Sequence, residues 1–328
     1  MPDDRAPLPA GAIATKSSSV PKPIKTAKAR PSALVVSFAA AAQSSATTRS
    51  YDADIRHFKQ NGGSIPATPT MVAEYLANFA AILAVSTLQH RLIAIHRAHT
   101  DVGLVSPVMD SLVKRTMQGI RRTLGTKQRQ VAALVKDDLL QMMVHVERQR
   151  PMKAARDKAL LLVGFAGAFR RSELVALQYA DMTCFESGLE LLIRRSKTDQ
   201  EGGGRTVFIP QARGSRCPVQ ALTTWLSMAG IVSGPLFRAI NRHDQVVGAK
   251  GLSPQSVALI DKSSVRMMAG DQMAKNVAGH SLRAGYCTEA ATVGLQPYQI
   301  REQTGHKSDV TLARYIRPVA KRKIPSLL

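Results

Sequence analysis

The 328-residue sequence lacks most features that mark secreted, membrane-spanning or metal-binding proteins. Its three cysteines, Cys184, Cys217 and Cys287, are widely separated, which excludes a disulfide framework and predicts reduced thiols inside a cell. No apolar run approaches the roughly 20 residues that a membrane-spanning helix needs. The N-terminus also lacks the continuous apolar core of a signal peptide. We therefore expect a cytoplasmic protein that does not associate with a membrane.

Acidic residues are scarce as well, with 23 Asp and Glu against 45 Lys and Arg, for a net charge of +22. A charge of this size predicts a polyanionic partner, although charge alone leaves open a basic protein with no nucleic-acid role. The sequence contains no cluster of Asp, Glu and His at the spacing of ligands for Mg²⁺ or Zn²⁺. We therefore expect an activity without a metal ion or other cofactor.

Hydrophobic residues make up 45% of the chain, and its length suffices for two domains. Residues 1–32 are rich in Pro, Ala, Ser and Lys, which predicts a disordered basic arm. Such an arm could contact phosphates or simply solvate the terminus. The remaining sequence predicts a helical domain over residues 33–124, a linker over 125–135 and a second domain over 136–328.

The first domain follows helical periodicity, which predicts four or five helices with short connections. Tyr51, Ile55 and Phe58 fall at helical spacing, and Pro69 suits the first position of a later helix. The expected N-caps are Thr47 or Thr48, Thr68, and Ser86 or Thr87. We therefore predict an all-α domain.

The end of this domain carries positive charge without one acidic residue over positions 111–130. A charge run is often only a solvated face, but an unbroken run at a domain junction favours contact with phosphates. The candidate DNA-contacting residues are Lys114, Arg115, Arg121, Arg122, Lys127 and Arg129.

The second domain mixes helical and strand periodicity. Residues 189–194 and 205–210 predict two strands of a hairpin, with Lys197 in their connection. Helices are expected over 218–228 and 254–268. The fold class is therefore predicted as mainly α with a small β-hairpin or sheet, that is, α+β.

Basic and phenolic side chains recur near the C-terminus. His280 and Arg283 lie three residues apart, which predicts a shared helix face, and His306 and Tyr315 follow. A phenol has a pKa of about 10 and becomes a useful nucleophile where cations surround it and its target is a phosphate. Cleaving a phosphodiester also needs donors for the non-bridging oxygens and a proton for the leaving oxygen. Each residue alone has a structural explanation, but their joint occurrence favours this chemistry.

The sequence contains the motifs Gly167-x-x-Arg170-x-x-Glu173-Leu174, Lys197 in a hairpin, His280-x-x-Arg283, Gly305-His306 and Tyr315. The six basic and phenolic positions in this order resemble the catalytic set of the tyrosine recombinase (phage integrase) family. The helical domain, including residues 46–51, resembles that family's core-binding domain, and residues 280–285 together with the short segment after Tyr315 are similar to the Cre-like bacterial integrases.

The resemblance implies a site-specific recombinase or integrase that cleaves and rejoins DNA without a metal ion. Tyr315 would attack the scissile phosphate, leaving a 3′-phosphotyrosyl link and a free 5′-hydroxyl. Arg170 and Arg283 would hold the non-bridging oxygens, and His306 would donate a hydrogen bond to one of them.

Three further roles follow from the same resemblance. Lys197 would protonate the leaving 5′ oxygen, and His280 would accept the tyrosine proton. Glu173 would fix the geometry of the site without reacting. The 5′-hydroxyl of a partner strand would then attack the covalent link and reseal the DNA without ATP.

The family's partners complete the expectation. The resemblance implies a bacterial, nucleoid-associated enzyme whose two domains form a clamp around double-stranded DNA at a core site with inverted repeats. It also implies a homotetramer on two DNA sites, with possible accessory DNA-bending proteins. The segment after Tyr315 could dock on a neighbouring protomer or fray. Two alternatives stay open: a type IB topoisomerase, and a DNA-binding regulator that kept the fold and lost the chemistry.

Overall fold

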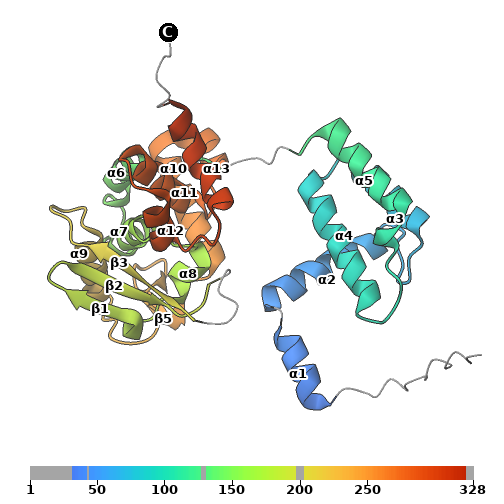
Figure 1. Cartoon of the computed structure of the whole chain (residues 1–328). Helices are drawn as coiled ribbons and strands as arrows, with labels where there is room; N and C mark the ends of the chain where they lie inside the picture. Colours follow the sequence, from blue (N-terminus) through green and yellow to red (C-terminus); the bar gives the residue numbers. More distant parts are fainter. Residues whose placement is uncertain (1–31, 43, 127–130, 197–202, 323–328) are drawn as a thin grey trace, which may run out of the picture. The chain divides into compact units, whose positions relative to one another are not determined.

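The chain divides into two compact units, Met1–Gln128 and Arg129–Leu328, each with its own hydrophobic core (Figure 1). The expected basic arm lies outside the described residues, except for residue 32, as do Lys127, Arg129 and Lys197. No helix within the described ranges is long and apolar enough to cross a membrane. The computed structural model describes residues 32–42, 44–126, 131–196 and 203–322, with only the backbone of 39–41 and 317–322.

Unit 1 is helical through its described residues, as the periodicity predicts. Its elements are α1 (Ala33–Ala41), α2 (Ser45–Gln60), α3 (Pro69–Phe79), α4 (Val85–Thr100), the 3₁₀ helix η1 (Pro107–Met109) and α5 (Ser111–Leu124). Helix α2 packs against α4, and α3 packs against α5. Phe58, Leu76 and Leu88 are fully buried between these helices, so the apolar faces of α2, α3 and α4 form the core.

Of the three N-caps predicted in unit 1, one is confirmed and two are wrong. Thr68 accepts a hydrogen bond from the Met71 N–H and Pro69 follows it, so this predicted N-cap is confirmed. The prediction for α2 is wrong, because Ser44 is its N-cap. The prediction for α4 is also wrong, because that helix begins after Ala84 and has no side-chain cap.

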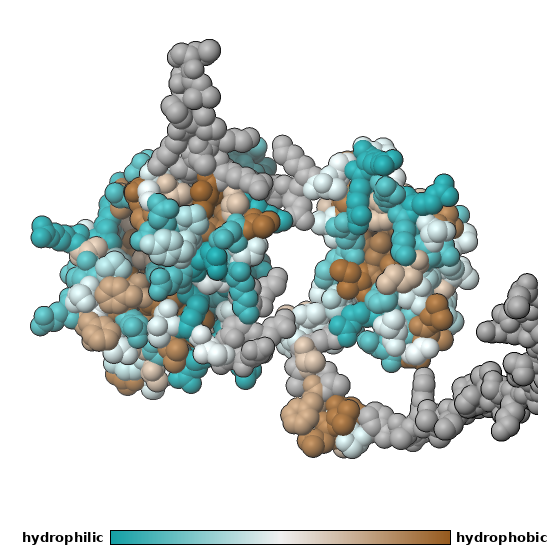
Figure 2. Space-filling view, in the orientation of Figure 1, coloured by the Kyte–Doolittle hydropathy of each residue, from teal (hydrophilic) through white to brown (hydrophobic). Residues whose placement is uncertain are grey.

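Helix α1 presents an apolar surface (Figure 2). Its side chains Leu34, Val35, Val36 and Phe38 are between 53% and 69% exposed. Contiguous exposed apolar surface of this kind is typical of interaction sites.

Unit 2 combines helices with short antiparallel strands (Figure 1). Its helices are α6 (Lys136–Val146), α7 (Pro151–Ala166), α8 (Arg171–Ala176), η2 (Tyr179–Asp181), α9 (Pro218–Met228), α10 (Pro254–Lys275), α11 (Ser281–Thr292), α12 (Pro297–Thr304) and α13 (Asp309–Arg322). Its strands are β1 (Met182–Phe185), β2 (Gly188–Ile193), β3 (Arg205–Pro210), β4 (Arg238–Ile240) and β5 (Val246–Gly251). The mainly helical α+β fold class is therefore confirmed.

The strands β1, β2 and β3 form an antiparallel sheet in that order. The predicted hairpin corresponds to β2 and β3, in which Leu191 pairs with Val207 and Leu189 with Ile209. These four side chains are buried, so the alternating pattern of the sequence places one face of the sheet on the core. The strands β1, β4 and β5 were not predicted, and α10 continues past the expected end at Met268 with a break at Gly270.

The core of unit 2 surrounds α7, which packs against α9. Trp225 on α9 is fully buried and donates through Nε1 to the Leu236 carbonyl at 2.8 Å. Asp244, in the turn between β4 and β5, accepts hydrogen bonds from the N–H groups of Met152 and Lys153 at 2.9 and 3.0 Å. A distant turn thus caps the first turn of α7.

The segment that leads into α6 is tied to the start of α11. The Ala132 N–H donates to the Asn276 carbonyl at 2.9 Å, and the Leu134 N–H donates to the Ser281 carbonyl at 3.0 Å. Gly285 on α11 lies so close to this segment that a Cβ there would stand 1.7 Å from the Leu134 carbonyl oxygen. Glycine is needed here because of this close backbone approach.

Candidate active site

The first part of the site forms where α7 ends and α8 begins. Ala168 has a φ of 48°, in the left-handed region, and the following residues turn the chain into α8. Glu173, 2% exposed, accepts from the Arg170 backbone N–H at 3.0 Å and from its Nη1 at 2.5 Å. This double contact fixes the Arg170 side chain at the N-terminus of α8.

A second arginine, Arg205 at the start of β3, reaches the same carboxylate. Its Nη2 lies 3.4 Å from Glu173 Oε2, and its Nη1 donates to the Gln303 carbonyl at 2.9 Å. Burial lowers the pKa of Arg205, while the charge of Glu173 opposes that effect. Arg205 therefore links the sheet to α8 and to the C-terminal end of α12.

The third arginine, Arg283, comes from α11 and is 2% exposed. Its Nη1 donates to the Ala168 carbonyl at 2.8 Å, and its Nη2 lies 3.1 Å from Nε2 of His306. Burial, reinforced by the charge of Arg170, lowers the pKa of Arg283 to about 10, so the guanidinium stays protonated at neutral pH.

His306 follows the end of α12, where Gly305 adopts the left-handed conformation at φ 65° and turns the chain. The His306 side chain is buried, and its Nδ1 lies 2.8 Å from the Thr304 hydroxyl. Burial, followed by the charges of Arg283 and Arg170, lowers the pKa of His306 to about 3. The imidazole is therefore neutral at physiological pH.

Tyr315 lies on α13, beside His306. Their ring centroids are 5.8 Å apart with an interplanar angle of 36°. The Tyr315 side chain is half-buried and packs against a small core that includes Cys287, Ile300 and Leu312. This packing holds the phenol next to an imidazole that also contacts Arg283.

The remaining predicted site residues have different outcomes. His280 is exposed and is the N-cap of α11, with a φ of −112°, and its carbonyl accepts from the Ala284 N–H at 2.9 Å; that it shares a face with Arg283 stays a prediction. It lies close enough to His306 to lower the pKa of that imidazole. Lys197, as noted, is outside the described residues, and no geometry is assigned to it.

The candidate DNA-contacting residues on α5 occupy its outer surface. Lys114, Arg115, Arg121 and Arg122 are exposed, whereas Val113, Met117 and Ile120 on the opposite side are buried. The helix is therefore amphipathic, with a basic outer face. Their contact with DNA stays a prediction.

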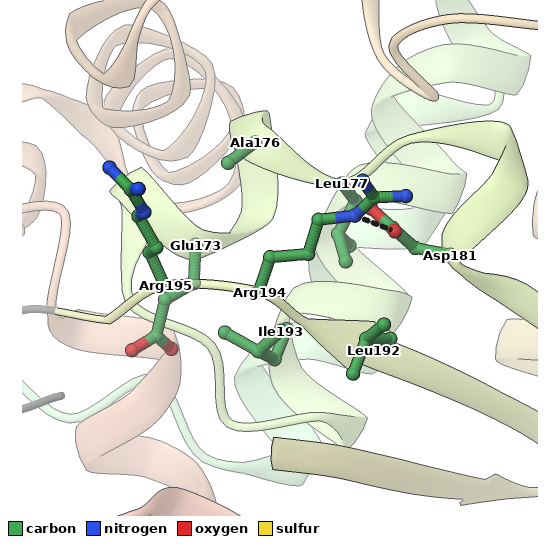
Figure 3. Close-up of a pocket in the computed structure, with 8 residues that line it drawn as sticks. All are labelled: Glu173, Ala176, Leu177, Asp181, Leu192, Ile193, Arg194 and Arg195. Atoms are coloured by element: carbon green, nitrogen blue, oxygen red, sulfur yellow. Dashed lines mark hydrogen bonds and ion pairs between the residues drawn. The ribbon is translucent and has the colours of Figure 1, made fainter. Parts of the chain in front are cut away.

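A pocket of about 250 Å³ opens beside the candidate active site, between α8 and the end of β2 (Figure 3). Glu173 lines it together with Arg194 and Arg195. Figure 3 shows the two arginines diverging, with Arg194 directed to Asp181, where its Nε lies 2.5 Å from Oδ1. Arg195, two residues after the end of β2, points away from that pair.

The electrostatics of the site favour an anion. Within the described part of the site, Arg170 and Arg205 contact the carboxylate of Glu173, and Arg283 lies close enough for that charge to affect its pKa. Because His306 is neutral, positive charge exceeds negative charge in a largely buried space. Such a cage suits a phosphodiester, whose oxygens accept several charged hydrogen bonds at once.

Two residues of this arrangement were not predicted. In the sequence Arg205 resembles any other strand residue. Its position directly after the glycine-rich segment 202–204 is the one local feature that could have marked it as a site residue. Thr304 precedes the Gly-His pair by one residue, but its hydroxyl contact depends on how α12 ends.

Comparison with known proteins identifies the family to which the chain belongs. The family model of the phage integrase family matches residues 132–322. The chain is also 38% identical, over 256 residues, to an integrase/recombinase XerD homolog of Selenomonas ruminantium, a match that covers 77% of this chain and 74% of that protein.

Solved recombinase structures have a similar fold. XerH recombinase bound to a palindromic difH substrate matches with a TM-score of 0.58 at 17% identity, over 78% of this chain and 70% of XerH. Lambda integrase bound to DNA also gives 0.58, at 14% identity, over 88% and 95%. The Tn1549 transposon integrase with transposon right end DNA gives 0.57 at 13% identity, over 86% and 94%. These identities show the fold alone. Because of the family match and the 38% identical relative, the chain belongs to the phage integrase family and is a tyrosine site-specific recombinase.

Proposed function

We propose that Tyr315 is the nucleophile of a DNA strand transfer that proceeds through a 3′-phosphotyrosyl intermediate. The observation that carries this proposal is the convergence of Arg170, Arg283, His306 and Tyr315 from separate segments of unit 2. Their contacts form a continuous chain, because Arg283 touches both the Ala168 carbonyl beside Arg170 and the imidazole beside Tyr315.

Arg170 and Arg283 hold the non-bridging oxygens of the scissile phosphate in this proposal. Both side chains are buried, so their hydrogen bonds to an anion form in a low-dielectric surrounding. Glu173 fixes Arg170 through two contacts, which supports a positioning role without a direct part in the reaction.

His306 donates to the phosphate in the same scheme. In the DNA-free site its Nε2 faces the Arg283 Nη2, which can only donate. Nε2 therefore accepts a hydrogen bond in this state. Donation to a phosphate oxygen requires Nε2 to carry a proton once the phosphate engages Arg283.

Proton transfers complete the reaction. His280 accepts the Tyr315 proton, which is consistent with its closeness to His306 and its exposure to solvent. Lys197 protonates the leaving 5′ oxygen; this assignment rests on its motif position alone. The attack of a partner strand's 5′-hydroxyl then releases Tyr315 and reseals the DNA without ATP.

The substrate is double-stranded DNA with an inverted-repeat core site. The net charge of +22 and the basic face of α5 support a polyanionic partner, and the similar solved structures include complexes with DNA core sites. We further propose that the two units clamp the duplex, that four protomers act on two sites, and that accessory DNA-bending proteins assist. A type IB topoisomerase and a non-catalytic regulator are less favoured, because the family match is to recombinases.

Covalent trapping on DNA tests this function. The binding site is first located by footprinting on DNA next to the gene, and a nicked suicide duplex with that site is then incubated with the protein. A covalent adduct on a denaturing gel is expected for the wild type and for Tyr298→Phe, an exposed tyrosine on α12 that serves as the matched control.

The variant Tyr315→Phe is expected to bind the duplex with unchanged affinity and to form no adduct. An adduct with Tyr315→Phe would show that another residue is the nucleophile. No adduct with wild-type protein on footprinted DNA would refute the enzymatic function. Strand exchange between two labelled duplexes separates a recombinase from a topoisomerase, which relaxes supercoils without joining different molecules.

A further inference from the structure

Thr304, the last residue of α12, contacts the candidate active site through a single hydroxyl group. The side chain is fully buried. Its Oγ1 lies 2.7 Å from the Ile300 carbonyl oxygen and 2.8 Å from Nδ1 of His306. The left-handed turn at Gly305 brings His306 back over the end of the helix and makes the second contact possible.

The hydrogen-bond partners determine which nitrogen of His306 carries the proton. Arg283 Nη2 is only a donor, so Nε2 of the neutral imidazole accepts and Nδ1 is protonated. The Nδ1–H then donates to Thr304 Oγ1, and the hydroxyl proton is directed to the Ile300 carbonyl. Every donor in this chain has an acceptor, and the other tautomer would place two donors against each other at Nε2.

A threonine hydroxyl bonded to the carbonyl four residues earlier is common in helices and by itself indicates no function. Thr288 on α11 makes such a bond to the Ala284 carbonyl at 2.9 Å. Thr304 differs because its hydroxyl also contacts an imidazole that contacts a buried arginine. The hydroxyl can donate to only one acceptor at a time, so its orientation and the tautomer of His306 are linked.

We propose that Thr304 is a positioning residue for strand cleavage, because its hydroxyl pairs with Nδ1 of His306 in either tautomer and thereby holds the imidazole that contacts Arg283. This inference rests on the proposed function. In the DNA-free site the hydroxyl accepts from Nδ1–H, and Nε2 holds Arg283 in place.

A phosphate that engages Arg283 releases Nε2 from this contact. The hydroxyl proton then turns from the Ile300 carbonyl to Nδ1. Nδ1 gives one proton to water and Nε2 takes one from water, so the imidazole remains neutral and its net proton count is unchanged. The resulting Nε2–H faces the position of the phosphate oxygen. A single hydroxyl thus supports both states of the site.

The first experiment measures single-turnover cleavage of the suicide duplex by Thr304→Val, which keeps the side-chain shape but removes the hydroxyl. We expect cleavage to be slower by about 10- to 100-fold, as is typical when the outer partner of a functional histidine is lost. Affinity for the duplex should not change. Thr304→Ser should restore most of the rate, and Thr288→Val, the matched control, should cleave like the wild type.

A double-mutant comparison separates a positioning role from a structural one. If Thr304 acts through His306, then adding Thr304→Val to His306→Gln should produce no further loss of rate. A further loss equal to that in the wild-type background would overturn the inference, since the hydroxyl would then act through α12 alone. Wild-type rates for the single variant Thr304→Val would overturn it as well.

A spectroscopic measurement tests the tautomer without any activity. In the ¹⁵N-labelled free protein, the imidazole nitrogen shifts of His306, assigned by comparison with His306→Gln, should show a protonated Nδ1. A protonated Nε2 in the wild type, or an Nδ1 shift in Thr304→Val that equals the wild-type value although the acceptor of Nδ1–H is gone, would contradict the inference even if the protein forms a covalent adduct. Failure of wild-type protein to form an adduct would instead refute the proposed function, so the two failures are distinguishable.

Discussion

Replacing Glu173 tests whether the cationic site depends on its single carboxylate. The Glu173 side chain is 1% exposed and interacts with the backbone N–H and Nη1 of Arg170 and with Nη2 of Arg205. Glu173→Gln keeps the size of the side chain but removes its charge. Glu173→Ala also removes the acceptor for the Arg170 N–H.

The expected loss of stability follows from these contacts. Truncating one partner of a buried ion pair typically costs about 3–5 kcal/mol, because the other charge is left uncompensated. Little solvent screening is expected, since the side chain of Arg170 is only 10% exposed and that of Arg205 is 19% exposed. We expect Glu173→Ala to lose about 3–5 kcal/mol. Glu173→Gln retains one acceptor oxygen and should lose about 2–3 kcal/mol, roughly the value of a charged hydrogen bond.

Urea unfolding followed by tryptophan fluorescence measures this effect directly. Trp225 is the only tryptophan of the chain and is fully buried in unit 2, so its emission reports on the unit that contains Glu173. Glu186→Gln, at an exposed turn between β1 and β2, is the matched control and should change stability by less than about 0.5 kcal/mol. Losses below about 1 kcal/mol for both Glu173 variants would refute the reasoning. Sulfate should stabilise Glu173→Gln more than the wild type at equal ionic strength, because it can replace the missing negative charge.

Three further changes test other parts of unit 2. Gly285→Ala should destabilise unit 2 by at least about 3 kcal/mol, because the new Cβ would stand 1.7 Å from the Leu134 carbonyl oxygen. Gly119→Ala on α5, where nothing lies within 4 Å of the new Cβ, is the control and should be neutral or slightly stabilising. Thermal melts followed by circular dichroism measure both variants. Asp244→Ala should lower the free energy of unfolding by about 1–2 kcal/mol through loss of the cap on α7, and Asp244→Asn, which tolerates the same φ of 62°, should lose less. The pKa of His306 is about 3 in the folded protein and about 6.5 in the unfolded chain. Between these two pH values the unfolded chain binds more protons than the folded protein. The free energy of unfolding is therefore highest above pH 6.5 and decreases as the pH falls. The difference in unfolding free energy between wild type and His306→Gln should therefore shrink from pH 7 to pH 5, and a constant difference would contradict the burial of a neutral imidazole.

Local sequence patterns were sufficient to predict the β2–β3 hairpin and the start of α3. The strands around the β2–β3 hairpin follow from alternating buried positions, and Thr68 with Pro69 begins α3 as a cap and first-turn pair. The step from Arg170 to Glu173 predicted a contact, which forms because Glu173, at the third position of α8, accepts from the backbone N–H and from the side chain of the N-cap residue Arg170.

Tertiary contacts decided the features that the sequence did not reveal. His280 is the exposed N-cap of α11, so its spacing of three residues from Arg283 does not by itself place it in the buried site. The short strands β4 and β5 carry no buried alternation, which leaves no periodic signal. The contacts of Arg205 with Glu173 and with the Gln303 carbonyl join residues far apart in the chain, and no local pattern encodes them.

The two backbone hydrogen bonds of residues 132 and 134 give the chain a mechanical property. They join the segment that precedes α6 to Asn276 and Ser281, on either side of His280. The bond at Leu134 ends at the first residue of α11, the helix that carries Arg283. A displacement of residues 132–134 would therefore reach the loop around His280 and the first turn of α11 directly, through two backbone hydrogen bonds.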